Sequence, residues 1–276
     1  MNSPGLLGDT TARDYVRKLK LFNAYAEPEL RQAIASLKLA PGMRLLDAGC
    51  GAGEALDWLR AEIAPEDILV GVDLASAHTR SARLATASGA LIVQADLLKP
   101  PLAGASFDLV WSVNTINHLH DPVAGVEILA ALLRPGGRIA LGQSSLLPDM
   151  YFAWNAGLEL KVTQAVREYY RARYRLEEQD LAAVRAMVGV LRRAKLHNVC
   201  ARTFVIERQF PLSLKDEAYI SEAIFRDTWG ERVQPYLSHD DYQELSRLCD
   251  PQNPAFALRR PDFHFLQTFT LVVGKV

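Results

Sequence analysis

A glycine turn and a series of acidic side chains are the residues of this sequence whose types and spacing could do chemistry. The turn Gly49-Cys50-Gly51-Ala52-Gly53 follows a short apolar run and precedes a helical pattern, which predicts a strand, a tight turn and a helix. Glycine adopts left-handed backbone conformations and leaves no Cβ to hold a ligand away. Gly49 and Gly51 therefore suit a nucleotide-like ligand above the helix N-terminus. We expect Gly53 to let the helix pack closely on the strand.

Acidic residues end the next two apolar runs. The run 68–74 ends in Asp73 and Leu74, and the run 91–97 ends in Asp96 and Leu97. In doubly wound α/β folds, an acid at the end of the second strand accepts hydrogen bonds from ribose hydroxyls. Asp96 would then be well placed for an adenine amino group. The competing interpretation of Asp73 is a helix cap or a solvated acid.

The order of these signatures distinguishes between classes of nucleotide-binding protein. A further apolar run at 107–112 and a Leu-Arg-Pro-Gly-Gly turn at 133–137 follow the two acids. A dinucleotide dehydrogenase would carry G-x-G-x-x-G instead of G-x-G-x-G, and it has no place for the second acid or the later turn. Over residues 40–145 the sequence resembles the class I S-adenosylmethionine-dependent methyltransferases. The resemblance is to the small-molecule branch that includes the ubiquinone/menaquinone-biosynthesis type.

The resemblance implies S-adenosyl-L-methionine as the cofactor and S-adenosyl-L-homocysteine as its product. Asp73 would then take the ribose hydroxyls, and Asp96 would take the adenine amino group while Leu97 packs on the ring. Ser112 and Asn114 would approach the methionine part, and Asp47 would hold its ammonium group or organise the loop. The cofactor-binding residues implied in this way are Tyr15, Asp47, Gly49, Gly51, Asp73, Leu74, Asp96, Leu97, Ser112 and Asn114. For Tyr15, packing of the N-terminal helix onto the domain is an equal alternative.

The segment 114–121 should lie beside the transferred methyl group. His118 is the candidate general base, because histidine titrates near neutral pH. Relatives of the quinone type often show a histidine pair here, whereas this sequence has Asn117-His118. His118 could instead only position the substrate. We assign no metal, because Asp121 of the His118-x-His120-Asp121 group is better explained as a helix cap.

The resemblance also implies the fold. It is a Rossmann-like, seven-stranded, mostly parallel sheet with helices on both faces, plus helical insertions after strand five and between strands six and seven that form a lid. We expect an N-terminal helical cover at 1–39 and a methyltransferase domain at 40–276 with insertions at about 148–175 and 211–262. Within the cover, Pro28 is expected to start a second helix. The first insertion is expected to be helical from 148 to 174, and the second to hold helices at 213–230 and 239–249.

The inserted segments are rich in aromatic residues, which fits a closed apolar pocket for a mid-sized organic acceptor. The candidate substrate-binding residues are Asn117, Tyr151, Trp154, Trp229 and His264. The segments could serve as a homodimer interface as readily as a lid. The Asn/Asp-Pro-Pro-aromatic tetrad of methyltransferases that act on nucleic-acid bases is missing after strand four, so a nucleic-acid substrate is not expected. The basic residues between 167 and 195 favour a solvated helix face, and the alternative is a contact with an anionic substrate tail or RNA.

Composition sets wider bounds. The chain has 276 residues, a formal net charge of -1 and 49% hydrophobic residues, which fits a globular protein without a strong attraction to polyanions. Its cysteines have no metal-type spacing, and no apolar run approaches the ~20 residues that would span a membrane. The N-terminus lacks the basic and apolar regions of a signal peptide, so we expect a cytoplasmic protein. The favoured function is methyl transfer to oxygen, nitrogen or carbon of a small, largely apolar or aromatic metabolite, as in natural-product or cofactor biosynthesis. The alternatives are a non-methylating reaction with the same cofactor, such as a cyclisation or rearrangement, and a non-catalytic partner subunit.

Overall fold

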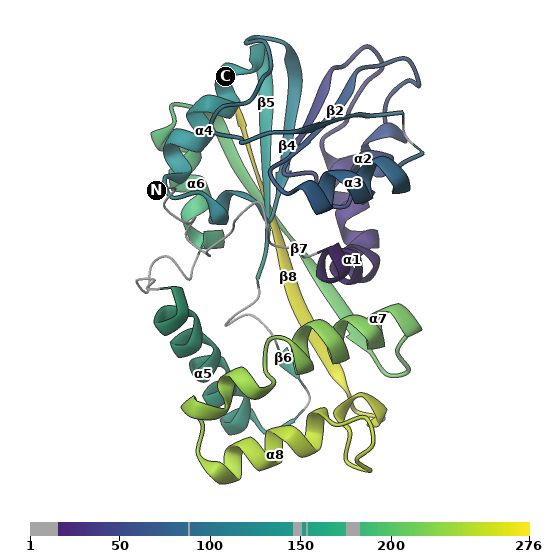
Figure 1. Ribbon diagram of the computed structural model, residues 1–276, viewed down its shortest axis with the longest axis vertical. Helices are drawn as coiled ribbons and strands as arrows, with labels where there is room; N and C mark the ends of the chain where they lie inside the picture. Colours follow the sequence, from purple (N-terminus) through teal and green to yellow (C-terminus); the bar gives the residue numbers. More distant parts are fainter. Residues whose placement is uncertain (1–15, 88, 146–150, 153, 175–182) are drawn as a thin grey trace.

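A single sheet runs through the molecule (Figure 1). The computed structural model describes residues 16–87, 89–145, 151–152, 154–174 and 183–276. Strands β1 to β5 are parallel in the order β3-β2-β1-β4-β5, β8 is antiparallel to β5, and both β6 and β7 pair antiparallel with β8. The strands are β1 Leu45–Ala48, β2 Leu69–Asp73, β3 Leu91–Gln94, β4 Phe107–Val113, β5 Leu133–Ser144, β6 Tyr151–Phe152, β7 His197–Gln209 and β8 His264–Lys275. This confirms the expected Rossmann-like sheet, to which β6 adds one short strand.

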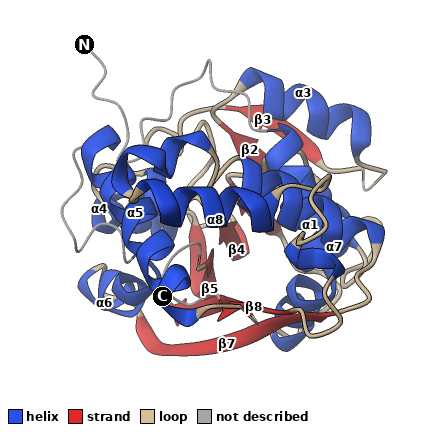
Figure 2. Cartoon of the chain, turned by 90° about the horizontal axis from the view of Figure 1, so that it is seen from below, coloured by secondary structure: helices blue, strands red, loops and turns tan. Residues whose placement is uncertain are grey.

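Helices cover both faces of the sheet (Figure 2). Helices α1, α2 and α3 lie on one face, and α4 and α6 lie on the other. The helices are α1 Val16–Ser36, α2 Glu54–Arg60, α3 Ser76–Ala85, α4 Pro122–Ala131, α5 Ala156–Tyr174, α6 Ala183–Arg193, α7 Leu214–Ala218 and α8 His239–Cys249. Shorter helical segments are the 3₁₀ turns η1 Ile116–His118, η4 Glu231–Tyr236 and η5 Ala257–Arg259, and the π-helix η3 Tyr219–Arg226. Each face therefore has its own buried core.

The long strands β7 and β8 continue beyond the parallel strands into a group of helices that we call the cap, made of α5, α7, η3, η4 and α8 (Figure 1). Helix α5 packs against η4. Lys161 Nζ of α5 lies 2.7 Å from Asp241 Oδ1 of α8. Thus segments from both expected insertions pack together. Because β5 runs toward β6 along β8, the carboxyl ends of the parallel strands face the cap.

The structure corrects two expected helix boundaries. Pro28 does not start a second helix, since α1 continues through it from Val16 to Ser36. Proline removes one backbone hydrogen bond, but buried residues on both sides of it, including Tyr25 and Leu30, hold the helix on the sheet. The helix expected from 148 begins only at Ala156, where Asn155 Oδ1 accepts from Leu158 N. Before it, Tyr151 and Phe152 form β6.

Arg208 joins the N-terminal helix, the sheet and the cap. From β7, its Nη1 and Nη2 donate to Glu29 Oε1 and Oε2 of α1 at 2.9 and 3.0 Å. Its Nε donates to Asp216 Oδ1 of α7 at 2.8 Å. The Arg208, Glu29 and Asp216 side chains are only 14%, 13% and 11% exposed. Bidentate pairing of this kind requires the planar guanidinium group.

Arg208→Lys should therefore lower the free energy of unfolding by about 2–4 kcal/mol, because lysine cannot satisfy both buried carboxylates. Urea denaturation followed by circular dichroism measures the change. The matched control is Arg202→Lys in the same strand, whose exposed guanidinium lies over Phe204 and should matter by less than about 0.5 kcal/mol. Equal effects of the two substitutions would contradict a special role for Arg208.

Candidate active site

The glycine turn after β1 has the conformation that the sequence predicts. Gly49 and Gly51 have φ values of +87° and +53°. A Cβ at Gly49 would lie 2.2 Å from Thr115 Oγ1, and a Cβ at Gly51 would lie 3.1 Å from Leu19 Cδ1. The turn is therefore enclosed by α1 and by the segment that follows β4, with no room for a side chain at Gly49 and a close contact at Gly51.

Gly53 has a different role from the one expected. It precedes α2 with φ +98°, and a Cβ there would lie 2.6 Å from Thr86 Cγ2 and 3.0 Å from Ala82 Cβ of α3. The close approach to strand β2 is made at Gly71 instead, where a Cβ would lie 2.9 Å from Leu56 Cδ1 of α2. The sequence showed that a small residue was needed, but not which neighbour required it.

Asp73 at the end of β2 is buried and holds the turn in place. Its Oδ2 accepts from Gly51 N at 2.9 Å, and its Oδ1 accepts from Ala75 N at 2.9 Å. His78 Nδ1 lies 3.1 Å from the same Oδ1. A carboxylate offers about four acceptor positions. Ribose hydroxyls at Asp73 would therefore share it with the backbone of the turn.

Asp47 is a buried carboxylate beside the turn. It is 2% exposed, and its Oδ2 has no hydrogen-bond partner among the residues that the structure describes. Burial raises the pKa of Asp47 to about 8, and the negative charges of Asp73 and Glu54 add to the effect. Glu54 itself accepts from Asn23 Nδ2 of α1 at 2.9 Å. An unpartnered, protonated carboxyl group next to two other acids is a ready site for a cationic group.

The remaining expected cofactor residues lie at the same edge of the sheet. Asp96 is exposed and its Oδ1 accepts from Leu98 N at 2.9 Å, while Leu97 is 7% exposed. Leu74 is 38% exposed, so it offers an apolar surface beside Asp73. Tyr15 lies outside the described residues.

Ser112 and Asn114 make hydrogen bonds within the sheet. Ser112 Oγ donates to Ala48 O at 2.7 Å and the residue is 1% exposed. Asn114 has φ +52°, and its Oδ1 accepts from Ser144 N at 2.8 Å. Both side chains thus connect β4 to its neighbours β1 and β5, which fixes the start of the segment that follows.

The segment after β4 forms the short helix η1, which carries Asn117 and His118. Both side chains are half-buried, and the buried Asn117 Oδ1 has no hydrogen-bond partner within the described part of the chain. Asp121 caps α4 by accepting from Ala124 N at 3.0 Å, with Pro122 in the first turn, which confirms the cap that the sequence indicated. Within the described ranges, no group of three or more histidine, cysteine or acidic side chains is arranged to hold a metal ion.

Among the candidate substrate residues, Trp154 and Trp229 come together in the cap. Their rings stack with centroids 5.4 Å apart, and Phe225 stacks on Trp229 at 5.6 Å. His264 is not part of this group, because its Nε2 lies 2.7 Å from Glu207 Oε1 and its side chain is 40% exposed. Tyr151 is in β6, and its side chain lies outside what the structure describes.

Sequence reasoning missed three residues around the turn: Leu19, Asn23 and Thr115. Leu19 lies in the expected N-terminal helical cover, within α1. A helical pattern alone does not predict that Leu19 faces Gly51, since that depends on how α1 crosses the sheet. None of the helices in the described residues has both the length and the apolar character needed to cross a bilayer.

Part of the chain is similar to known methyltransferases. Residues 46–141 match the family model described as a methyltransferase domain. The 27-O-demethylrifamycin SV methyltransferase of Amycolatopsis mediterranei is 34% identical over 137 residues, which are 48% of this chain and 47% of that protein. The chain spans about half the length of the curated relatives it matches.

Solved structures share the fold. A chain from the complex between the Haloferax volcanii Trm112 methyltransferase activator and a methyltransferase has a TM-score of 0.56 and 19% identity, covering 96% of this chain and 98% of that chain. Phosphoethanolamine N-methyltransferase 2 of Haemonchus contortus, solved with phosphomonomethylethanolamine and S-adenosylhomocysteine, has a TM-score of 0.53 and 16% identity, covering 94% and 57%. Residues 46–141 therefore match the model of a methyltransferase domain, and the chain shares its fold with these solved structures.

The state of Asp47 leads to a prediction about stability. The folded protein keeps the Asp47 proton up to about pH 8, whereas the unfolded chain releases it near its ordinary value of 3.8. The contribution of Asp47 to the free energy of unfolding is therefore largest below about pH 4, where the carboxyl group is protonated in both states. This contribution is lost as the pH rises from about 4 to about 8, because the unfolded chain ionises first. Asp47→Asn cannot ionise, so its unfolding free energy should exceed that of the wild type by more than about 1 kcal/mol at pH 8.5, and by less at pH 5.

Urea denaturation of the ligand-free protein at both pH values measures this difference. The matched control is Asp240→Asn, an exposed acid in the first turn of α8. A difference between Asp47→Asn and wild type that does not grow between pH 5 and pH 8.5 would show that Asp47 is ionised in the folded protein.

Proposed function

We propose that this chain is a methyltransferase that uses S-adenosyl-L-methionine, releases S-adenosyl-L-homocysteine, and methylates oxygen, nitrogen or carbon of a small, largely apolar or aromatic metabolite. The observation that carries the proposal is the unpartnered carboxyl oxygen of Asp47 beside the left-handed turn of Gly49 and Gly51. This oxygen has no hydrogen-bond donor within the described residues, and the ammonium group of the cofactor would supply one together with a positive charge. The Amycolatopsis mediterranei relative, named as a rifamycin methyltransferase, supports a small-molecule acceptor.

The cofactor would extend along the carboxyl edge of the strands. Its ammonium group would lie at Asp47 and its ribose at Asp73, which already fixes the turn through Gly51 N. The adenine ring would reach Asp96 between the apolar side chains of Leu74 and Leu97. When bound, the sulfonium centre supplies an activated methyl group.

The protein's part in the reaction is mainly alignment and exclusion of water. Ser112 and Asn114 hold the end of β4 rigidly, so that η1 presents Asn117 and His118 at the edge of the site. The unpartnered Asn117 Oδ1 could accept a hydrogen bond from the acceptor. His118 would take the proton where the acceptor has one to lose.

The cap would cover the acceptor. Trp229, Phe225 and Phe256 are 4%, 2% and 1% exposed, so these side chains are buried within this one chain. That favours a cover over a dimer interface for the cap. We leave His264 out of the proposed pocket because Glu207 already binds its imidazole ring.

Isothermal titration calorimetry with S-adenosylhomocysteine tests the cofactor site. A bound cation favours the ionised form of Asp47, so binding should release protons and tighten as the pH rises toward about 8. Asp47→Asn should weaken binding about tenfold or more and remove this pH dependence. Asp73→Ala should abolish binding, because the turn loses the acceptor of Gly51 N.

Asp240→Asn again serves as the control and should bind like the wild type. The absence of binding of both S-adenosylmethionine and S-adenosylhomocysteine to the wild type would refute the proposed function.

The role of His118 is tested on an acceptor identified by a mass gain of one CH₂. His118→Gln should lower kcat by about 10²- to 10⁴-fold for an acceptor that must lose a proton, while cofactor binding is unchanged. The neighbouring His120→Gln is the control and should retain kcat. An unchanged kcat in His118→Gln would leave His118 as a packing or positioning residue, and a product without added mass would favour non-methylating chemistry.

A further inference from the structure

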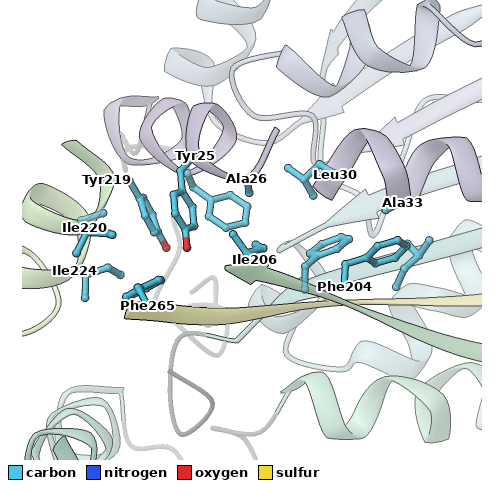
Figure 3. Close-up of a cluster of buried hydrophobic side chains, with 14 of the residues drawn as sticks. Tyr25, Ala26, Leu30, Ala33, Phe204, Ile206, Tyr219, Ile220, Ile224 and Phe265 are labelled. Atoms are coloured by element: carbon cyan, nitrogen blue, oxygen red, sulfur yellow. The ribbon is translucent and has the colours of Figure 1, made fainter. Parts of the chain in front are cut away.

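Two tyrosines are stacked where α1 meets the cap (Figure 3). The rings of Tyr25 from α1 and Tyr219 from η3 have centroids 4.2 Å apart and planes 17° apart. Tyr25 is 0% exposed and Tyr219 is 1% exposed. Their hydroxyl groups point in the same direction, away from α1 and toward the side of Phe265 (Figure 3). The pair therefore presents two phenolic oxygens together inside an apolar cluster.

The hydrogen bonds around Tyr219 show whether its hydroxyl group acts as a donor or as an acceptor. Gln267 Nε2 donates to Ser145 O at 2.7 Å, which fixes the orientation of the Gln267 amide. Tyr219 Oη then donates to Gln267 Oε1 at 3.2 Å. The O–H of Tyr219 is thus already donated to Gln267, and its oxygen can still accept a hydrogen bond.

Tyr25 Oη, in contrast, has no hydrogen-bond partner in the described part of the chain. The rest of this residue is firmly held, since Tyr25 O accepts from Arg208 Nη2 at 2.6 Å and the guanidinium carbon of Arg208 lies 4.8 Å from the ring centroid. Burial raises the pKa of both tyrosines, so both hydroxyls stay protonated. A rigidly placed donor without an acceptor destabilises the ligand-free protein. Such a group is therefore expected to have a function, for example in binding a ligand.

The tyrosine pair is connected to the proposed site of reaction. Ser145 follows Ser144, the last residue of β5, and Ser144 N donates to Asn114 Oδ1 at the end of β4. Hydrogen bonds, together with the peptide bond between Ser144 and Ser145, therefore connect Asn114 after β4 to Gln267 and Tyr219. In addition, Tyr219 begins a π-helix, a conformation that occurs frequently at functional sites.

We propose that Tyr25 and Tyr219 together bind a neutral hydroxyl group of the methyl acceptor, with Tyr25 Oη donating a hydrogen bond to its oxygen and Tyr219 Oη accepting a hydrogen bond from its O–H. A hydroxyl is the group that accepts and donates at once, whereas a carbonyl oxygen cannot donate and an ammonium group cannot accept. The surrounding side chains of Ile206, Ile220, Ile224 and Phe265 are apolar, which disfavours a charged group (Figure 3). This inference rests on the proposed function and specifies its substrate class as a hydroxylated apolar or aromatic compound.

The test compares two probes that differ in one group, 2-naphthol and 2-methylnaphthalene. Their dissociation constants are measured by saturation-transfer difference NMR at pH 7 on the full chain saturated with S-adenosylhomocysteine. Wild type should bind 2-naphthol about tenfold more tightly than 2-methylnaphthalene. Tyr25→Phe keeps the stacked ring and should bring this ratio close to one, with S-adenosylhomocysteine binding unchanged.

Two further variants separate recognition from folding. Tyr25→Phe should not lower Tm, because its hydroxyl has no partner in the protein, whereas Tyr219→Phe should lower both the naphthol preference and Tm, since Gln267 Oε1 loses its donor. The control Tyr242→Phe on α8 should change neither.

An unchanged preference in Tyr25→Phe would mean that the hydroxyl meets only a bound water, and the inference would be wrong. Wild type that binds neither probe, or both equally, would also overturn it. Failure of wild type to bind S-adenosylhomocysteine would instead refute the proposed function, so the two failures are distinguishable.

Discussion

The ion-pair group around Arg208 is the interaction on which the arrangement of this molecule depends. Arg208 lies near the end of β7, in the part of the strand that extends beyond β5, and it binds Glu29 of α1 and Asp216 of α7. One guanidinium group therefore sets the position of the N-terminal helix relative to both the sheet and the cap. Through α1 the same contact places Leu19 against Gly51 and Tyr25 against Tyr219. The proposed cofactor and acceptor sites thus share one structural support.

Several buried polar atoms have no hydrogen-bond partner among the described residues. Asp47 Oδ2, Asn117 Oδ1 and Tyr25 Oη are all buried without a hydrogen-bond partner in the described ranges. Each such group destabilises the ligand-free fold by about 1–3 kcal/mol. Their chemistry differs in a way that suits one reaction: a carboxyl for a cation, an amide oxygen for a donor, and a phenol for a hydroxyl. A ligand that forms the missing hydrogen bonds would remove this destabilisation, and the gain would add to its binding free energy.

The part of the chain that the family model matches ends near the last residues of β5, at residue 141. It contains the turn, Asp73, Asp96 and η1, which are the groups proposed for the cofactor and the proton. The cap and the ends of β7 and β8 lie outside it, and they hold the aromatic stack and Tyr219. In our proposal, the matched part thus holds the cofactor-binding residues together with Asn117 and His118, and the segments outside it add further contacts to the acceptor.

The sequence by itself determined the sheet, because strand-forming runs, left-handed glycines and capping residues such as Asp121 act within a few residues of the chain. It also indicated the edge where Gly49, Asp73 and Asp96 meet, since parallel strands bring their carboxyl ends together. Only the tertiary structure decided that Gly53 faces α3, that α1 passes through Pro28, and that His264 binds Glu207. It alone paired Tyr25 with Tyr219, residues 194 positions apart. Such contacts depend on how packed helices cross, and local sequence patterns do not predict that geometry.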